Sequence, residues 1–551
     1  MKKQLVYLLT GWLMCGMGLQ ARAQVEPLFT YKISRDEACN RWVESQMKQM
    51  NLREKIGQLF IYTIAPDRSK RNLALLKNVV HTHKVGGLLF SGGKLDNQAL
   101  LTNQAQKMAD VPLMITFDGE WGLSMRLRGT PVFPKNMVLG CIQDDRLIYE
   151  YGQEMARQCR ELGVQVNFAP VADVNINPQN PVINVRSFGE NPLLVADKVI
   201  AYASGLESGR VLSVAKHFPG HGDTDVDSHK ALPVLPFTRE RLDSVELYPF
   251  RKLIHAGLGG VMVGHLQVPV FEPIGKLPSS LSRNVVYTLL TEKMAFKGLI
   301  FTDALAMKGV SSAQKVCLQA LKAGNDVVLA PRDVKKEIDY VVEAVKKGEF
   351  TEEEIDERCR KVLLFKYAMG LNRKPVVRLS GLERRINTPH TRDLIRRLNL
   401  AAVTVLNNEK GVLPIHPDVK KVAVLTVGKA KELEAFTNEL KKYVEVHTFE
   451  LGKQMPDSLQ QKLRDSLSAY RRIIVPVNEI RLAPYQSFFA KFAPQVPVVY
   501  AFFTPAKLML QIHRAISNAS SVVLGHTDSD EVQQQIAALL FGKAAANGRL
   551  S

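Results

Sequence analysis

Eight short apolar runs, separated by longer amphipathic segments, constrain the fold of this 551-residue chain more than any other feature. The runs are GQLFIYT (57–63), GGLLFS (86–91), PLMITF (112–117), VQVNFA (164–169), LSVAKH (212–217), GGVMVG (259–264), GLIFTD (298–303) and NDVVLA (325–330). Continuous apolar strands that alternate with helices are typical of a parallel sheet covered on its outside by those helices. Eight such units predict a (β/α)8 barrel of the TIM type.

A second, smaller domain is predicted after the barrel, because one hydrophobic core rarely extends over so long a chain. The segment 371–394 is polar and aperiodic, which favours a linker between a barrel domain (24–370) and a second domain (395–551). The second part contains five further strand candidates: KVAVLTV (421–427), YVEVHTF (443–449), RIIVPVN (472–478), VPVVYAF (496–502) and SSVVLGH (520–526). Amphipathic helices between them indicate an open α/β domain. Its sequence has no GxGxxG motif or P-loop, so nucleotide binding has little support.

The first 23 residues are expected to form a secretory signal peptide. Lys2 and Lys3 precede an apolar core (5–19), and the small-x-small triplet ARA (21–23) ends it. A lipoprotein processed at Cys15 is the disfavoured alternative, because the preceding WLM lacks the small residue that such processing requires. No other stretch is apolar enough to span a bilayer, so the sequence predicts an exported protein of the periplasm or cell surface without stable membrane insertion.

The basic charge of the chain does not indicate a nucleic-acid site. Loss of Lys2, Lys3 and Arg22 with the signal peptide lowers the formal net charge from +19 to +16. The remaining basic residues are scattered through amphipathic segments, without long runs or interleaved aromatic residues. This pattern is typical of a solvated basic surface, and nucleic acid is not expected as a partner.

Polar residues follow several of the predicted barrel strands at the point where each strand ends. They are Asp118, Asp173, Arg186, His265 and Asp303, together with the stretch KHFPGHGDTDVDSH (216–229). In a (β/α)8 barrel the loops after the strands converge on one face, where chemistry takes place. We therefore expect these residues to meet. Asp173 and His265 are interpreted as structural hydrogen-bonding residues beneath the barrel mouth.

The stretch 216–229 has three interpretations: a metal site, a proton-transfer site or a polar loop. His217 and His221 are four residues apart, which would place two metal ligands on one face of a helix. Pro219, Gly220 and Gly222 make a helix improbable there, so the spacing loses that meaning. No metal and no other cofactor is predicted.

Proton transfer, unlike the paired metal ligands, does not require the stretch to be helical. Histidine can give and take a proton near neutral pH, and a nearby carboxylate stabilises its charged form. Asp227 and His229 supply such a pair, and Asp303 could act as a nucleophile opposite them. One attacking carboxylate and one acid/base form the set that a double-displacement reaction requires.

These residues also resemble a known family. KHFPGHGDTDVDSH together with KGLIFTDALAM (297–307) resembles family 3 glycoside hydrolases of the β-N-acetylhexosaminidase branch. Further matches are ITFDGEWGLSMR (115–126), NFAPVADVN (167–175), VRSFGENP (185–192), GGVMVGH (259–265) and PSSLSRNVV (278–286). The resemblance is strong from about residue 36 to residue 370. It extends more weakly through AAVTVLNNEKGVLPI (401–415), which is similar to the start of that family's second, α/β sandwich domain.

The resemblance implies a role for individual residues. Asp303 would form the covalent glycosyl intermediate, His229 would be the general acid/base, and Asp227 would orient it. The sugar would be bound by a set of polar side chains: Asp118, Arg126, Arg186, Lys216 and His217. The DxDSH ending of the stretch, absent from the family's glucosidases, implies N-acetylglucosamine rather than glucose. Trp121 departs from the family pattern, because it stands where a glycine is usual.

Three functions are compatible with this sequence. The first is a metal-independent retaining β-N-acetylglucosaminidase that acts on cell-wall fragments or related glycans. The second is a phosphorylase of the same glycosides, since a histidine acid/base would not repel phosphate as a carboxylate would. The third is a catalytically silent carbohydrate-binding or scaffold protein, which intact Asp227, His229 and Asp303 disfavour. In two-domain relatives an end such as NGRLS (547–551) is often followed by more residues, so truncation relative to longer relatives is left open.

Overall fold

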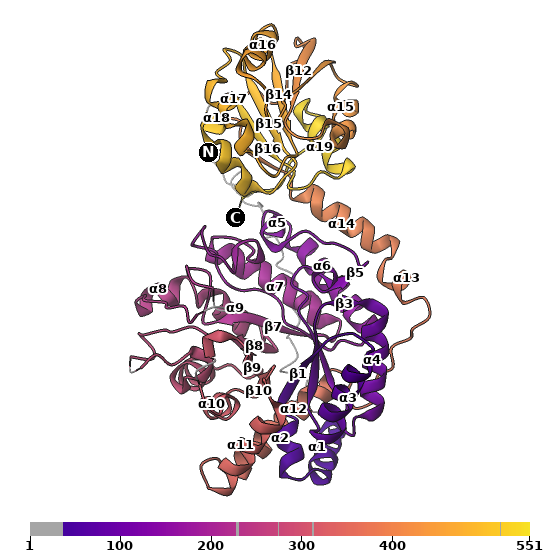
Figure 1. Cartoon of the computed structure of the whole chain (residues 1–551), viewed down its shortest axis with the longest axis vertical. Helices are drawn as coiled ribbons and strands as arrows, with labels where there is room; N and C mark the ends of the chain where they lie inside the picture. The colour runs from indigo at the N-terminus through magenta and orange to yellow at the C-terminus, as the bar shows by residue number, and fades with distance from the viewer. Residues whose placement is uncertain (1–36, 228–230, 274, 311–312, 518, 551) are drawn as a thin grey trace, which may run out of the picture.

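The computed structural model describes residues 37–227, 231–273, 275–310, 313–517 and 519–550. Figure 1 shows a larger domain followed, towards the C-terminus, by a smaller one. The expected signal peptide and His229 lie outside the described residues.

Eight parallel strands close the larger domain into a barrel (Figure 1). In chain order they are β1 (Phe60–Ile64), β2 (Gly87–Phe90), β4 (Met114–Phe117), β6 (Val166–Asn167), β7 (Leu212–Phe218), β8 (Gly260–Val263), β9 (Leu299–Ala304) and β10 (Val327–Leu329). Neighbours along the chain are neighbours in the barrel, and β1 pairs with β10 to close it. Each strand lies within, or shifted by one residue from, a predicted apolar run, which confirms the predicted barrel.

Helices cover the outside of the barrel, as expected for strands that are apolar on both faces. They include α3 (Lys70–Lys77), α4 (Leu95–Met108), α6 (Asp145–Glu161), α7 (Pro192–Ser208), α8 (Arg239–Ser244), α9 (Tyr248–His255), α10 (Val316–Ala323) and α11 (Val334–Lys346). Many begin at a side-chain cap: the Asn191 side chain, for example, accepts hydrogen bonds from the first turn of α7, where Pro192 occupies the first position. Within the described ranges, no helix is long and apolar enough to cross a membrane.

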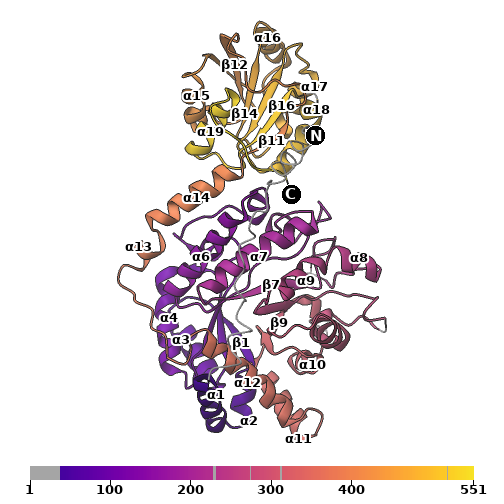
Figure 2. The same cartoon turned by 180° about the vertical axis from the view of Figure 1, so that it is seen from behind.

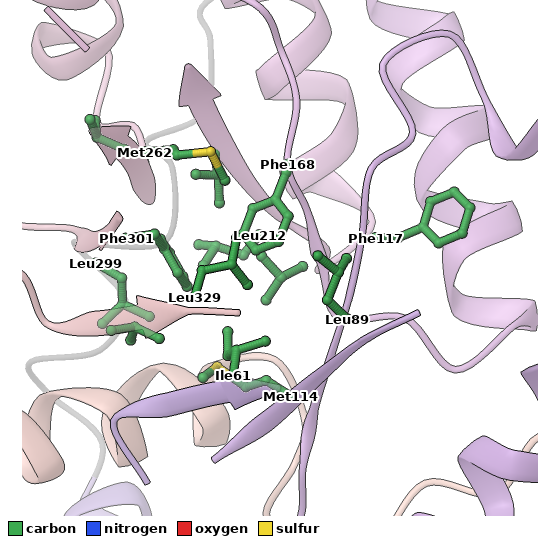
Figure 3. Packing of buried hydrophobic residues seen from close by; sticks show 14 of the residues in the cluster. Ile61, Leu89, Met114, Phe117, Phe168, Leu212, Met262, Leu299, Phe301 and Leu329 are labelled. Carbon is green, nitrogen blue, oxygen red and sulfur yellow. The ribbon is translucent and has the colours of Figure 1, made fainter. Parts of the chain in front are cut away.

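The barrel interior is filled by aliphatic and aromatic side chains. Figure 3 shows Leu89, Leu212, Met262, Phe301 and Leu329 directed towards one another from different strands. The rings of Phe168 and Phe301 meet edge to face, with centroids 5.6 Å apart. The interior is therefore a packed core rather than a channel.

Three further helices lie at one end of the barrel in Figure 1: α1 (Glu37–Gln49), α2 (Leu52–Gly57) and α12 (Glu352–Ala368). A capping box of Thr351 and Glu354 begins α12. Lys366 of α12 is fully buried, and its Nζ donates a hydrogen bond to Oε1 of Gln58 at 2.7 Å. The structure thus places a lysine amino group in the interior, next to a neutral amide.

The smaller domain has a six-stranded sheet between two layers of helices, which confirms the predicted α/β sandwich (Figure 2). The strand order is β11 (Thr404–Asn407), β16 (Ser521–Leu524), β15 (Val498–Phe502), β14 (Ile473–Val477), β12 (Lys421–Thr426) and β13 (Glu445–Glu450). One face packs against α15 (Glu434–Leu440) and α19 (Asp530–Leu540). The other packs against α16 (Asp457–Ser468) and α17 (Gln486–Lys491). The edge strand β11, which pairs antiparallel with β16, was not among the five predicted strands.

The segment expected to be a linker contains helices α13 (Leu382–Ile386) and α14 (Pro389–Ala401). Thr391 of α14 donates a hydrogen bond from Oγ1 to Oε1 of Glu154 at 2.6 Å, and Nη1 of Arg397 lies 2.8 Å from Oε2 of Glu150. Beyond the helices, the backbone N–H of Arg549 donates to the carbonyl of Cys141 at 2.9 Å. The connection between the domains is therefore bonded along the surface of the barrel.

Candidate active site

A cavity of about 280 Å³ lies at the carboxyl ends of the barrel strands. Its apolar part includes Leu89, Met262 and Leu329, which also belong to the barrel core. Its polar part consists of Asp118, Glu120, Arg126, Arg186, Lys216, His217 and Asp303. Among the described residues, every one that lines the cavity comes from the barrel domain. The predicted convergence of strand-end residues therefore occurs.

Lys216, near the end of β7, lies at the centre of the charged residues. Its Nζ is 2.9 Å from Oδ1 of Asp118 and 2.8 Å from Oε1 of Glu120, and its side chain is buried. Burial opposes ionisation, but the two carboxylates raise the pKa of Lys216 above its usual value. Lys216 is therefore a fixed cation shared by two carboxylates.

Both carboxylates have a second, arginine partner. Nη2 of Arg126 lies 2.9 Å from Oδ2 of Asp118. Arg186 binds Glu120 through two parallel contacts, Nε to Oε2 at 2.9 Å and Nη2 to Oε1 at 2.8 Å. Burial alone would raise the pKa of each acid, but these cations hold the pKa of Asp118 and that of Glu120 below their usual values. The network presents several hydrogen-bonding groups in fixed positions to a ligand.

His217 follows Lys216, yet both side chains line the cavity. On a regular strand two successive side chains point to opposite faces. The pairing of β7 with β8 shifts register between Lys216 and Phe218, so the strand is irregular at this point. Asp173 then fixes the imidazole: its Oδ2 lies 2.7 Å from Nδ1 of His217, while Nε2 lies 3.3 Å from Nη2 of Arg186.

Asp303 ends β9 at the cavity wall. Its Oδ1 accepts a hydrogen bond from the backbone N–H of Ala304 at 2.7 Å. Burial would raise the pKa of Asp303, but His265, His217 and this hydrogen bond lower it below its usual value. The carboxyl group is therefore ionised at neutral pH, the state that a nucleophile requires. His265 itself does not line the cavity; its Nδ1 lies 2.8 Å from Oγ of Ser280.

Asp227 lies on the loop between β7 and α8 and is half-buried. Its carbonyl accepts a hydrogen bond from the backbone N–H of Ala231 at 3.0 Å. It is not among the residues that line the cavity. The structure thus gathers six of the eight predicted site residues around one cavity, places Asp227 on the adjoining loop, and leaves His229 outside the described residues.

Two residues of the site have a larger part than the sequence indicated. Glu120, which binds both Lys216 and Arg186, was not among the predicted site residues. Its position two residues after Asp118, just past β4, was the available signal. Asp173 was interpreted as structural, and it does accept hydrogen bonds from the backbone N–H groups of His217 and His221. It also orients the His217 ring directly.

The metal interpretation of the histidines finds no match in the geometry. Over the described ranges, no group of three or more His, Cys, Asp or Glu side chains is arranged to hold a metal ion. Nδ1 of His221 lies 2.7 Å from Oγ1 of Thr224, and burial lowers the pKa of His221 to about 4. His221 is a neutral residue that shapes the loop.

Known proteins share these motifs and this fold. The family model described as "Glycosyl hydrolase family 3 N terminal domain" matches residues 51–365. β-Hexosaminidase A of Pseudoalteromonas piscicida is 30% identical over 391 residues, which are 65% of this chain and 65% of that protein. β-Hexosaminidase LpqI of Mycobacterium tuberculosis is 34% identical over 331 residues, which are 57% of this chain and 82% of the relative.

Solved structures extend the likeness over both domains. A family 3 β-N-acetylglucosaminidase from Paenibacillus sp. str. FPU-7 is 30% identical, with a TM-score of 0.71, covering 91% of this chain and 98% of that one. The β-glucoside phosphorylase BglX is 21% identical with a TM-score of 0.75, covering 94% and 96%, and shows the shared fold alone. The resemblance inferred from the motifs, and with it the predicted class of enzyme, is confirmed. The chain belongs to glycosyl hydrolase family 3.

Proposed function

We propose that this protein is an exported, retaining β-N-acetylglucosaminidase that removes terminal N-acetylglucosamine from cell-wall fragments or related glycans. The observation that carries the proposal is the ionised Asp303 at the wall of a small cavity lined by Asp118, Glu120, Arg126, Arg186, Lys216 and His217. The names of the relatives from P. piscicida and Paenibacillus sp. support hexosaminide substrates. Export is supported by the N-terminal sequence.

In the first step, a carboxylate oxygen of Asp303 attacks the anomeric carbon of the sugar. The bond from that carbon to the leaving oxygen breaks as His229, oriented by Asp227, donates a proton to this oxygen. The sugar is left bound to Asp303 through an ester. Lys216, Arg126 and Arg186 bind its polar groups and hold the ring in place for the attack.

In the second step, His229 removes a proton from a water molecule whose oxygen attacks the anomeric carbon. The ester bond breaks, Asp303 regains its negative charge, and His229 regains its proton. Two inversions at one carbon return the β configuration, which is the stereochemical mark of double displacement.

The substrate is tested with three 4-nitrophenyl β-glycosides: the N-acetylglucosaminide, the glucoside and the N-acetylgalactosaminide, each with and without phosphate. We expect the N-acetylglucosaminide to have the highest kcat/KM and phosphate to leave its rate unchanged. Formation of a sugar phosphate would instead establish phosphorolysis. Absence of turnover with all three glycosides would contradict the proposal.

The mechanism is tested at Asp303. Asp303→Ala should abolish turnover, and NMR of the first product should show the β anomer. A slow fluorinated N-acetylglucosaminyl fluoride should leave a covalent adduct on the peptide that contains Asp303, detectable by mass spectrometry. An α anomer, or an adduct on another peptide, would contradict double displacement through Asp303.

A further inference from the structure

Residues 219–227 lead from the cavity residue His217 to Asp227. One side of this segment is hydrogen-bonded to neighbouring parts of the barrel domain. The backbone N–H of His221 donates to Oδ1 of Asp173 at 2.7 Å. Nδ2 of Asn180 donates to the carbonyl of His221 at 2.8 Å, and Nδ2 of Asn177 donates to that of Thr224 at 3.3 Å. These partners belong to the loop between β6 and α7, and among the contacts of the described residues the last of them along the segment is at Thr224.

On its other side, an arginine of α8 bonds to the segment. Nη2 of Arg241 lies 3.1 Å from Oδ2 of Asp223 and 3.0 Å from Oε1 of Glu246. The guanidinium also packs on the ring of Phe237, 4.5 Å from its centroid. Arg241 thus joins an acid of the segment to an acid that follows α8.

Glu246, the second acidic partner of Arg241, is buried beneath the segment. Its side chain is 3% exposed, and both of its carboxylate oxygens are buried. The segment passes directly over it at Gly220, where a Cβ would lie 2.6 Å from Cβ of Glu246. Gly220 also has a φ of +134°, so glycine meets both the close approach and the backbone conformation. Burying a carboxylate under a loop with one arginine partner gains little stability, because the cost of desolvation offsets the attraction. Stability alone therefore does not explain this arrangement.

We propose that Arg241 and Glu246 are positioning residues, which hold Asp223 and thereby fix Asp227, four residues further along, for its part in proton transfer. The proposal rests on the proposed function, in which Asp227 orients His229. Past Thr224 the segment becomes exposed at Asp225. The bond from Asp223 to Arg241 is therefore the last described side-chain contact to α8 before Asp227. A misplacement of about 1 Å can lower a rate roughly a hundredfold, which is why such a bond affects catalysis.

The choice of leaving group separates positioning from a general loss of structure. A phenyl N-acetylglucosaminide needs a proton on its leaving oxygen, whereas a 2,4-dinitrophenyl one does not, and general acids contribute roughly 10²- to 10⁴-fold. We expect Arg241→Met and Asp223→Ala to lower kcat/KM for the phenyl glycoside at least about tenfold, and for the dinitrophenyl glycoside less than about threefold. Asp223→Asn, which can still accept the hydrogen bond, should recover part of the loss.

The matched control is Arg239→Met on the same helix. The guanidinium of Arg239 stacks on the ring of Phe271, 5.0 Å from its centroid, and makes no hydrogen bond or ion pair with the described residues of the segment, so turnover of both glycosides should be unchanged. Asp223→Ala keeps the contact between Arg241 and Glu246, and it remains informative if Arg241→Met fails to fold. Equal losses on both glycosides, or no loss on either, would overturn the proposal.

Hydrogen exchange distinguishes failure of this proposal from failure of the proposed function. Backbone amides of 219–227 should exchange faster in Arg241→Met and Asp223→Ala than in the wild type, and at the wild-type rate in Arg239→Met. Unchanged exchange in the first two variants would overturn the positioning role whatever the activity. Faster exchange in these two variants, together with a wild type that is inert on every N-acetylglucosaminide, would refute the catalytic role of Asp227 and leave the bond to the segment established.

Discussion

Nδ1 of His217 lies 2.7 Å from Oδ2 of Asp173, and the same carboxylate accepts the backbone N–H groups of His217 and His221. One buried acid thus fixes both the imidazole that lines the cavity and the backbone that carries it. The bond at Nδ1 leaves Nε2 directed towards Arg186, which also lines the cavity.

Asp173→Ala should therefore lower kcat/KM more than tenfold, because the imidazole loses its orientation. Each buried N–H left without an acceptor should also lower the free energy of unfolding by about 1–3 kcal/mol. Steady-state kinetics and denaturant unfolding measure the two effects. Asp225→Ala, a change at an exposed aspartate of the loop between β7 and α8, is the control, and an equal loss in it would refute the assignment.

Lys216→Met should destabilise the protein strongly. Removing the shared ammonium leaves Asp118 and Glu120 buried near each other with one arginine each, and breaking a buried ion pair costs about 3–5 kcal/mol. Adding Glu120→Gln to this variant should recover part of the stability, since one uncompensated charge disappears, without restoring sugar binding. Thermal unfolding and KM measure the two outcomes. A double variant less stable than Lys216→Met would contradict this account.

Glu246 should make stability depend on pH. Burial raises the pKa of Glu246 from its ordinary value of 4.5 to about 7 in the folded protein, although Arg241 opposes the shift. The folded state therefore holds the proton more tightly, so its contribution is complete below pH 4.5 and is lost as the pH rises through about 7. Glu246→Gln should remove this loss. The difference in free energy of unfolding between variant and wild type should grow between pH 5 and pH 8, by about 1.4 kcal/mol for each unit of pKa shift.

Lys366 should make stability depend on pH in the opposite direction. Burial lowers the pKa of Lys366 from its ordinary value of 10.5 to about 7 in the folded protein, where its Nζ contacts the neutral Gln58. The stability contribution of the neutral amine is present above pH 10.5 and is lost as the pH falls through about 7. Lys366→Met should therefore stabilise the protein by a few kcal/mol at pH 6 and progressively less towards pH 10. Equal effects at both pH values would show that the folded protein does not lower the pKa of Lys366.

The fold was largely predictable because strands buried on both faces are apolar along their whole length. Strand β11 escaped prediction because it is short, only partly buried and paired at a sheet edge. Helix α14 escaped because its buried face is narrow, consisting of Thr391, Leu394 and Leu398 in an otherwise polar segment. In both cases the interactions that stabilise the element come from other parts of the chain.

The site was predictable where topology alone brings residues together. Asp118, Lys216, His217 and Asp303 stand at strand ends, and any closed barrel collects such positions on one face. Glu120 was missed because its importance depends on two cations from distant loops. The contacts of Arg241 with Asp223 and Glu246 were also missed, since they depend on how a short helix packs against a loop.

The charges around the cavity determine which kind of ligand it can bind. Three carboxylates (Asp118, Glu120 and Asp303) face three cations (Lys216, Arg126 and Arg186), so these six groups together carry no net formal charge. An entering anion would gain no long-range attraction from this balanced set, and it would have to displace internal partners to reach a cation. An uncharged, hydroxyl-rich molecule can insert its own donors and acceptors between fixed opposite charges. The cavity is thus a polar but electrically neutral recess, suited to a neutral sugar ring.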